Sequence, residues 1–366
     1  MGGPRKMKKK NTTFLFILIF LVIFTLIFQF SVWDSFAQIR TEVGKSNGWR
    51  EIRFNINTHS GPNWCASGRY FVVGGWGGTG IRLVDISSGD IQEITNNVRH
   101  RNPSCSHGGR YIFFTDSLPG EYKNLYVYNA KTKEIFSIYS LGEPLPVIKL
   151  DEPLSPSGKY LIGPDNWKDQ ITLPGGEIVT IVPIREIVEI DKPIGNFRIE
   201  WSLDSGRLYL LNVSSQILFI RDLKSNNQKI VQLKIGGFEV TKIKPSPNDS
   251  RLYINAVSDE KKVANLYVMD LKNPEETPKL FIENVFDFDI DSYGTFVFSR
   301  IYRGINHIHN HLYLADSSGG VSFINRYFFF NWPIIPHISR DGKAIAFWQK
   351  LKADQKVITV LVRDNK

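Results

Sequence analysis

Short apolar runs with alternating polar positions recur along this chain after residue 49, and each follows a small polar turn. Typical copies read SPSGKYLIG at residues 155–163 and SRDGKAIAFW at residues 339–348. The alternation and the β-branched and aromatic side chains predict β-strands, whereas Gly and its polar neighbours predict turns. Seven copies occur, at residues 64–73, 104–114, 154–163, 201–211, 245–255, 289–299 and 338–348.

The spacing of the copies predicts the architecture. Arg69, Arg110 and Lys159 follow the first three turns at intervals of 41 and 49 residues, and the later intervals lie between these values. A turn-and-strand repeat of this length is typical of β-propellers, with one blade per copy. We therefore predict an all-β fold, a seven-bladed β-propeller of four-stranded blades over residues 49–366, with no helix longer than two turns. The third blade is expected to be irregular, with its third strand near residues 177–184.

The two ends of the predicted ring complement each other. After the seventh copy, residues 357–362 supply one further strand, which leaves the last blade one strand short. Residues 49–56 form a strand-like segment that belongs to no copy. We predict that residues 50–54 pair with residues 357–362, because this pairing closes the ring and removes exposed strand edges.

The N-terminal segment has the pattern of a targeting element. Five basic residues precede an apolar stretch of about 20 residues, which is long enough to cross a bilayer as a helix. We predict a basic cytoplasmic tail at residues 1–12, a transmembrane signal-anchor at 13–33 and a juxtamembrane linker at 34–48, with the propeller outside the cytoplasm, periplasmic or extracellular. A cleaved signal peptide is the alternative, since residues 35–37 resemble a cleavage site.

Charge and cysteine content narrow the possible partners. Five of the nine net positive charges belong to the N-terminal tail, so the rest of the chain carries too few to form a nucleic-acid-binding stripe. Cys65 and Cys105 are the two cysteines, at near-equivalent points of adjacent blades. Two interpretations stay open, a disulfide in an oxidising compartment or two small buried apolar side chains.

The phrases SPSGKYL, SLDSGRLYL and SRDGKAIAF resemble the SPDG-type repeats of TolB-like propellers, which are close to the Trp-Asp-repeat group. The resemblance covers residues 49–366 and concerns turns and strands, not catalysis. It implies the propeller fold. The α/β domain that precedes the propeller in TolB has no room here, so a role in envelope transport is not carried over.

Candidate site residues come from loops that the propeller geometry gathers on one face. Three histidines alternate at His307, His309 and His311, and imidazole is a common metal ligand. Side chains at positions i and i+4 of a strand lie roughly 13 Å apart, which argues against one shared ion. We expect the wider loop face to bind a partner through aromatic, basic and acidic side chains, namely Trp76, Arg99, His100, Arg101, Asp116, Trp167, Arg303, His307 and His309. Asp165 and His59 are expected on the same face.

These features favour a membrane-anchored propeller that binds a protein or glycan partner without catalysis. We assign no cofactor and no metal, and we expect the single-pass membrane segment to hold the propeller at the surface. The alternative is a metal-dependent enzyme acting on polysaccharide, like some propeller lyases that use histidine ligands around the channel. No nucleophile–base or paired-carboxylate arrangement stands out in the sequence to support that enzyme.

Overall fold

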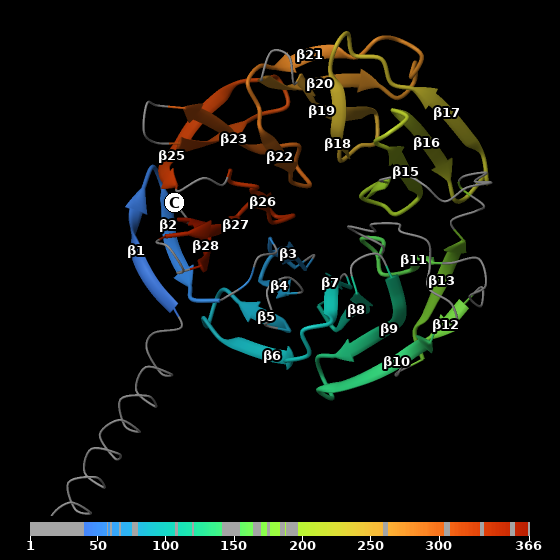
Figure 1. Cartoon of the computed structure of the whole chain (residues 1–366), viewed down its shortest axis with the longest axis vertical. Helices are drawn as coiled ribbons and strands as arrows, with labels where there is room; N and C mark the ends of the chain where they lie inside the picture. The colour runs from blue at the N-terminus through green and yellow to red at the C-terminus, as the bar shows by residue number, and fades with distance from the viewer. Residues whose placement is uncertain are drawn as a thin grey trace, which may run out of the picture.

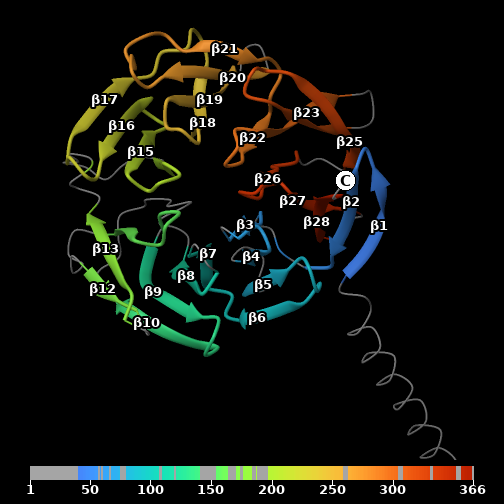
Figure 2. The same cartoon turned by 180° about the vertical axis from the view of Figure 1, so that it is seen from behind.

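Seven small β-sheets follow one another around a ring in the computed structural model of the chain (Figure 1; seen from behind in Figure 2). In the five four-stranded sheets the first strand lies toward the centre of the ring and the fourth lies at its periphery. The structure describes residues 40–364 except 57, 59–60, 66, 75–79, 107–108, 119–120, 141–153, 164–169, 174–175, 184–186, 188–196, 259–262, 304–307, 330–332 and 352–355.

Each blade is built from strands that are consecutive in the chain, except blade seven, which combines strands from both ends. Blade one has β3 (Asn63–Trp64), β4 (Tyr70–Gly74), β5 (Ile81–Asp85) and β6 (Ile91–Thr95), and blade two has β7 (His100–Cys105), β8 (Tyr111–Leu118), β9 (Glu121–Asn129) and β10 (Glu134–Ser140). Blade three has β11 (Tyr160–Gly163), β12 (Gln170–Thr172) and β13 (Ile178–Pro183), and blade four has β14 (Phe197–Trp201), β15 (Arg207–Asn212), β16 (Ile217–Asp222) and β17 (Gln228–Gln232). Blade five has β18 (Glu239–Pro245), β19 (Arg251–Ser258), β20 (Val263–Asp270) and β21 (Lys279–Ile282), and blade six has β22 (Asp287–Ile290), β23 (Phe296–Arg303), β24 (Ile308–Ala315) and β25 (Val321–Phe329). Blade seven has β26 (His337–Ile338), β27 (Ala344–Lys350) and β28 (Lys356–Arg363), joined by β1 (Arg40–Ser46) and β2 (Trp49–Phe54).

Ring closure follows the prediction. β2 pairs antiparallel with β28, with Arg50 opposite Val362 and Phe54 opposite Ile358. β2 is not the outermost strand, however, because β1 pairs with its other edge and makes blade seven five-stranded. The range 34–48, expected as a linker, therefore contributes a strand to the propeller. Residues 40–46 can do so because Asn47 and Gly48, both with positive φ, form the tight turn into β2.

Five of the seven blades have the predicted four strands, and blade three departs from them. In the part of blade three that the structure describes, β13 lies between β11 and β12 and runs parallel to β11. The expected strand near residues 177–184 is therefore present as β13. Leu154 makes one antiparallel bridge with Leu161 where the other blades have their innermost strand.

The recurring turn is held by its first residue. In five blades a serine hydroxyl accepts a hydrogen bond from the backbone amide five residues further on, at 2.8–3.0 Å; the pairs are Ser106–Tyr111, Ser155–Tyr160, Ser202–Arg207, Ser246–Arg251 and Ser339–Ala344. In blade six the carboxylate of Asp291 accepts a hydrogen bond from the amide of Thr295, four residues further on, at 2.8 Å. In blade one Cys65 occupies this position. The recurring sequence therefore forms the hydrogen-bonded turn between the first and second strands of a blade.

Apolar side chains fill the space between neighbouring blades. One cluster joins Phe54 and Val360 of blade seven to Phe71 of blade one, and another joins blades four and five. Cys65 and Cys105 form a disulfide between blades one and two, with their Cα atoms 5.0 Å apart, so the first of the two interpretations is the one that the structure has.

No helix among the described residues is long and apolar enough to cross a membrane. The segment predicted to be the signal-anchor, 13–33, lies outside those residues.

Candidate functional site

A cavity of about 170 Å³ lies on the axis of the ring, where all seven blades meet. Its wall contains the residue two positions before the first residue of the recurring turn, contributed by six blades: Asn63, Ser104, Glu200, Lys244, Asp289 and His337. We call these six residues the channel ring. Each is polar, whereas the next residue in each strand, such as Trp201 or Ile338, is apolar and packs between blades. Strand alternation therefore turns one side of each innermost strand to the channel.

Ion pairs connect the channel ring across blades four, five and six. The ammonium of Lys244 lies 2.9 Å from Oε2 of Glu200 and 3.7 Å from Oδ1 of Asp289, and all three side chains are mostly buried. Two residues earlier on the same two strands, Nζ of Lys242 lies 2.7 Å from Oδ1 of Asp287. Partly buried charges need such partners, because an isolated charge in this position would lose most of its hydration. The carboxylates of this half of the channel are therefore engaged in holding blades together.

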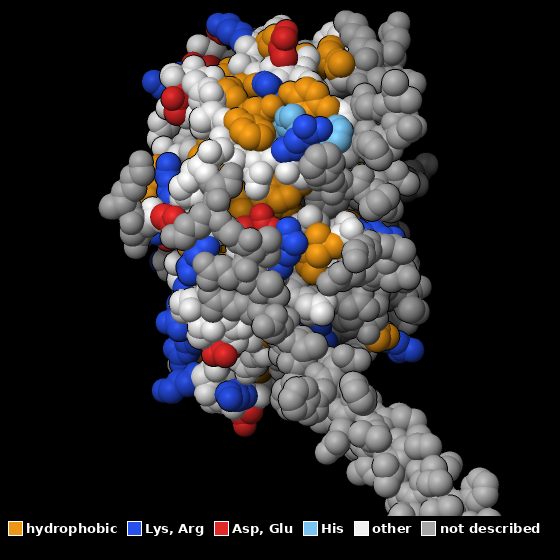
Figure 3. Space-filling view, turned by 90° about the vertical axis from the view of Figure 1, so that its left-hand side faces the viewer, with side chains coloured by type: hydrophobic (Ala, Val, Ile, Leu, Met, Phe, Trp, Pro, Cys, Tyr) orange, Lys and Arg blue, Asp and Glu red, His pale blue; other side chains and the backbone are white. Residues whose placement is uncertain are grey.

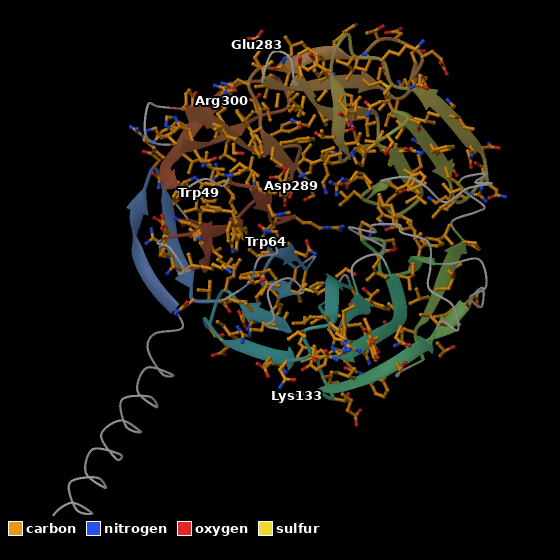
Figure 4. The ribbon with its side chains drawn as sticks, viewed as in Figure 1. Trp49, Trp64, Lys133, Glu283, Asp289 and Arg300 are labelled. Atoms are coloured by element: carbon orange, nitrogen blue, oxygen red, sulfur yellow. A yellow bond between two sulfur atoms is a disulfide. The ribbon has the colours of Figure 1, made fainter. Side chains whose placement is uncertain are left out.

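The channel-ring residues of blades one, two and seven carry no carboxylate or ammonium group, and hydrogen bonds to backbone groups link blade seven to blades one and six. The indole Nε1 of Trp64 donates to the carbonyl of His337 at 2.9 Å, and the amide of Ile338 donates to Oδ2 of Asp289 at 3.1 Å. Gly61 lies against the imidazole of His337, since a Cβ at this position would be 2.9 Å from Nε2. In Figure 4, Trp64 and Asp289 both lie near the centre of the ring.

Two titratable groups in the cavity wall have shifted pKa values. Burial lowers the pKa of His337, against the opposing influence of Asp289, so its imidazole is neutral near pH 7. Burial raises the pKa of Asp291, although the amides of Thr295 and Tyr293 donate to its carboxylate and oppose the shift. These side chains give the cavity a mixture of charged, neutral and aromatic surface, which suits recognition of a polar group.

The mouth of the cavity is formed by the second residue of the recurring turn. This position holds Pro156, Leu203, Pro247, Ser292 and Arg340 in blades three to seven. We call these five residues the mouth ring. The frame of the turn is constant from blade to blade, whereas the mouth-ring residue is apolar, hydroxylic or cationic. A composite surface of this kind can be specific for one partner although each contributing turn is simple.

The predicted loop-face residues are distributed differently. His100 begins β7 and is buried, with its ring centroid 4.8 Å from that of Phe114 and 4.9 Å from that of Tyr126. Its Nδ1 lies 2.9 Å from the hydroxyl of Thr95, and burial lowers its pKa. Asp116 is its backbone partner on β8. The structure thus brings His100 and Asp116 together and gives His100 a packing role, whereas a role of His100 in binding stays a prediction.

The remaining predicted residues are only partly described. Arg99 is exposed, and His309 lies on β24 in blade six. The backbones of Arg101 and Arg303 are in strands, but their side chains lie outside the described part. Trp76, Trp167, His307, His59 and Asp165 also lie outside it. Of the predicted residues whose side chains are described, none lines the central cavity.

The described histidines do not assemble into a metal site. His309 and His311 occupy one face of β24, where Nε2 of His309 lies 3.0 Å from Nη2 of Arg326. Across the part of the chain that the structure describes, no group of three or more His, Cys, Asp or Glu side chains is placed to hold an ion. The three-histidine arrangement itself stays a prediction, because His307 is not among these residues.

The channel ring and the mouth ring were not predicted from the sequence, although the repeat contains their signal. Aligning the copies on the first turn residue places polar side chains at the position two before it in six blades, each followed by an apolar residue. A charge in that setting, such as Lys244, is unusual and indicates either an ion pair or a channel. The residues predicted from loop composition come instead from connections at the opposite ends of the strands.

The ring of seven blades around a polar channel defines the chain as a seven-bladed β-propeller. No known family model and no curated protein sequence matches it. Solved structures do. An oligogalacturonate lyase in complex with manganese has a TM-score of 0.60 at 11% identity, covering 88% of this chain and 95% of the lyase. The β-propeller domain of Myceliophteria thermophila Cps50 (Swd1) has a TM-score of 0.52 at 11% identity, covering 88% and 99%. TolB from Acinetobacter baumannii has a TM-score of 0.43 at 11% identity, covering 80% and 67%. At these identities the similarity concerns the fold alone.

Proposed function

We propose that this protein is a non-catalytic binding module, displayed outside the cytoplasm, that receives a protein or glycan partner at the mouth of its central cavity. The observation that carries the proposal is the mouth ring, in which a constant turn presents different side chains from blade to blade. Leu203 is 36% exposed there, and Arg340 adds a cationic group. Apolar and arginine side chains at the edge of a concave site are typical of recognition surfaces.

The size and chemistry of the cavity favour binding of one small group. A cavity of about 150 Å³ is large enough to take up a benzene molecule, so 170 Å³ can accept one protruding side chain or one sugar ring. Glu200 and Asp289 are held by Lys244, which favours a structural and recognition role for these carboxylates over proton transfer. The metal-dependent lyase remains the alternative hypothesis and depends on His307, whose position is not described.

Location outside the cytoplasm is supported by two independent features. The disulfide between Cys65 and Cys105 is of a kind that persists in oxidising compartments and is rare in the cytosol. The apolar segment at residues 13–33, preceded by five basic residues, favours a membrane anchor with a cytoplasmic N-terminus. Anchoring would keep the mouth ring close to partners at the cell surface.

Site-specific photo-crosslinking in the native membrane tests the proposal. A photoreactive amino acid replaces Leu203 in the mouth ring of the full-length protein, and in a matched control it replaces Lys133, an exposed residue at the periphery of blade two (Figure 4). We expect a discrete, light-dependent adduct from position 203 and none from position 133. Protease or glycosidase treatment of the adduct then distinguishes a protein from a glycan. Absence of an adduct at 203, or equal adducts at both positions, contradicts the proposal. One equivalent of bound metal that is lost in a His307→Ala/His309→Ala variant would favour the lyase instead.

A further inference from the structure

The outer part of blade six has an unusual surface, distant from the central cavity. Cross-strand partners of β23, β24 and β25 place aromatic, histidine and arginine side chains on one face of the sheet: Phe298 opposite Tyr313, Arg300 opposite His311, Tyr302 opposite His309, Tyr313 opposite Phe323 and His311 opposite Arg326. We call Arg300, Tyr302, His309, His311, Tyr313, Phe323 and Arg326 the blade-six face. In Figure 3, hydrophobic side chains gather around histidine and arginine side chains on this side of the molecule, and Figure 4 places Arg300 well away from the channel.

The rings of this face contact one another and form a continuous platform. The centroid of His311 lies 4.4 Å from that of Tyr302 and 5.6 Å from that of Phe323. Tyr313 lies 5.6 Å from Phe323, and the guanidinium of Arg300 lies 4.9 Å above the Tyr313 ring. The tyrosine hydroxyls of Tyr302 and Tyr313 are 3.2 Å apart. The platform therefore combines apolar ring surface with hydroxyl and imidazole groups at hydrogen-bonding distance from each other.

Part of this platform is open to solvent. Tyr302 is 37% exposed and Phe323 is 46% exposed, and Arg326 is also exposed. Neither Tyr302 nor Phe323 belongs to the two core clusters that contain residues of blade six, whereas Tyr313 packs against one of them. Clustered exposed rings on a soluble domain usually mark an interaction site.

The charge of the surface is positive. Arg300 and Arg326 are its charged members; Nη2 of Arg300 also donates to the backbone carbonyl of Glu283 in blade five at 3.2 Å, and Nη2 of Arg326 lies 3.0 Å from Nε2 of His309. Burial lowers the pKa of His311, and the neighbouring Arg326 and His309 lower it further, so the positive charge of this surface comes from the arginines. A ligand that fits this surface must therefore carry anionic groups beside a flat or weakly polar face.

We propose that the blade-six face binds an anionic polysaccharide, with sugar rings stacked on Tyr302 and Phe323 and with carboxylate or sulfate groups paired to Arg300 and Arg326. A pyranose ring has an apolar face for aromatic contact and hydroxyls for the tyrosine and imidazole groups. Arginine forms directed hydrogen bonds to planar or tetrahedral oxyanions.

An acidic peptide fits the surface less well. Extended peptides commonly bind by adding a strand to a sheet edge, through backbone hydrogen bonds. The platform lies on the face of the sheet, and at the edge strand β25 the carbonyl of Ile324 already accepts a hydrogen bond from Nδ2 of Asn47 at 2.8 Å. The inference is independent of the central cavity and stands whether or not the mouth ring binds a partner.

Binding of defined polymers to the full-length protein in detergent tests this inference. The probes are an alginate oligosaccharide, which carries carboxylates, dextran sulfate, neutral dextran and polyglutamate. We expect binding of one or both anionic polysaccharides and at least tenfold weaker binding of neutral dextran and polyglutamate. Comparison of alginate with dextran sulfate identifies the anion that is recognised.

Substitutions on the blade-six face link binding to this surface. Phe323→Ala and Arg326→Gln should each weaken polysaccharide binding about tenfold, the effect of removing one anchor side chain. The matched controls are Leu280→Ala and Arg251→Gln, exposed residues of blade five that should leave binding unchanged. Thermal melts of all four variants confirm that they are folded. The inference is overturned if no anionic polysaccharide binds, if polyglutamate binds equally well, or if the two pairs of variants have the same effect.

Discussion

Removal of the Cys65–Cys105 disulfide should lower the free energy of unfolding of the propeller by an amount that depends on the length of the loop that the bond closes. The bond closes a loop with a sequence separation of 40 residues, spanning blade one. The chain-entropy relation for a loop of this length gives about 4 kcal/mol. For a propeller of roughly 300 residues, with about 2.1 cal/mol/K of unfolding entropy per residue, this corresponds to a fall in Tm of about 6 °C.

The choice of replacement matters at one of the two positions. Cys65 occupies the turn position where other blades have a serine whose hydroxyl accepts the amide five residues on. Cys65→Ser can therefore form the same hydrogen bond to the amide of Tyr70 and isolates the loss of the bond itself. We use Cys65→Ser with Cys105→Ala, because the wild-type fold offers no equivalent role for a hydroxyl at position 105.

Calorimetric melts of the full-length protein, with and without a phosphine reductant, test this value. The oxidised protein should melt about 6 °C above both the reduced protein and the double variant, and the reductant should leave the double variant unchanged. Mass spectrometry establishes the redox state of each sample. A reduced protein that melts within 1 °C of the oxidised form would refute the reasoning, since the cross-link would then contribute nothing. A low Tm for the double variant alone would assign the loss to side-chain packing.

Three further predictions concern other parts of the ring. Lys244→Met removes the cation from between two partly buried carboxylates and should lower the free energy of unfolding by about 2–4 kcal/mol in urea titrations, whereas an unchanged midpoint would show that the ion pairs are inert. Deleting residues 40–46 should lower the Tm by a few degrees, whereas deleting 40–54 opens the ring and should abolish cooperative melting; equal effects of the two deletions would contradict the closure of the ring by β2. Burial lowers the pKa of both His100 and His337, so the unfolded chain binds more protons as the pH falls below about 6.5; stability should be complete above that pH and should decrease toward pH 5, and His100→Gln should reduce this slope.

Much of the fold could be predicted from the sequence because its elements are local and repeated. The turn and the strand that follows it lie within about ten residues, so seven copies specify seven blades, and the spare strand at residues 49–56 identifies the closure. β1 was missed because RTEVGKS has little apolar alternation, so its strand character depends on pairing with β2. The parallel placement of β13 beside β11 likewise depends on how a loop crosses the blade, which strand propensity does not encode.

The candidate site was less predictable, for a related reason. Each of six blades contributes one residue to the channel ring, so no contiguous sequence motif indicates it. The ring of His100 packs against those of Phe114 and Tyr126, a contact that the loop-like sequence around it does not indicate. Only the alignment of repeats on a structural position, in this case the first turn residue, separates channel-facing residues such as Lys244 and Asp289 from ordinary polar residues.

The position of β1 at the outer edge of blade seven has a mechanical consequence. Tension applied through the N-terminal segment reaches the propeller at Arg40, which pairs with Phe54 at the far end of the β1–β2 hairpin. The hydrogen bonds between β1 and β2 would therefore break sequentially from Arg40 toward Ser46. The force would act on the pairing of β2 with β28 only after β1 had detached. After that release blade seven would still hold four strands and the ring would remain closed. Loss of β1 would thus lengthen the segment that precedes the propeller and leave the strands around the channel paired.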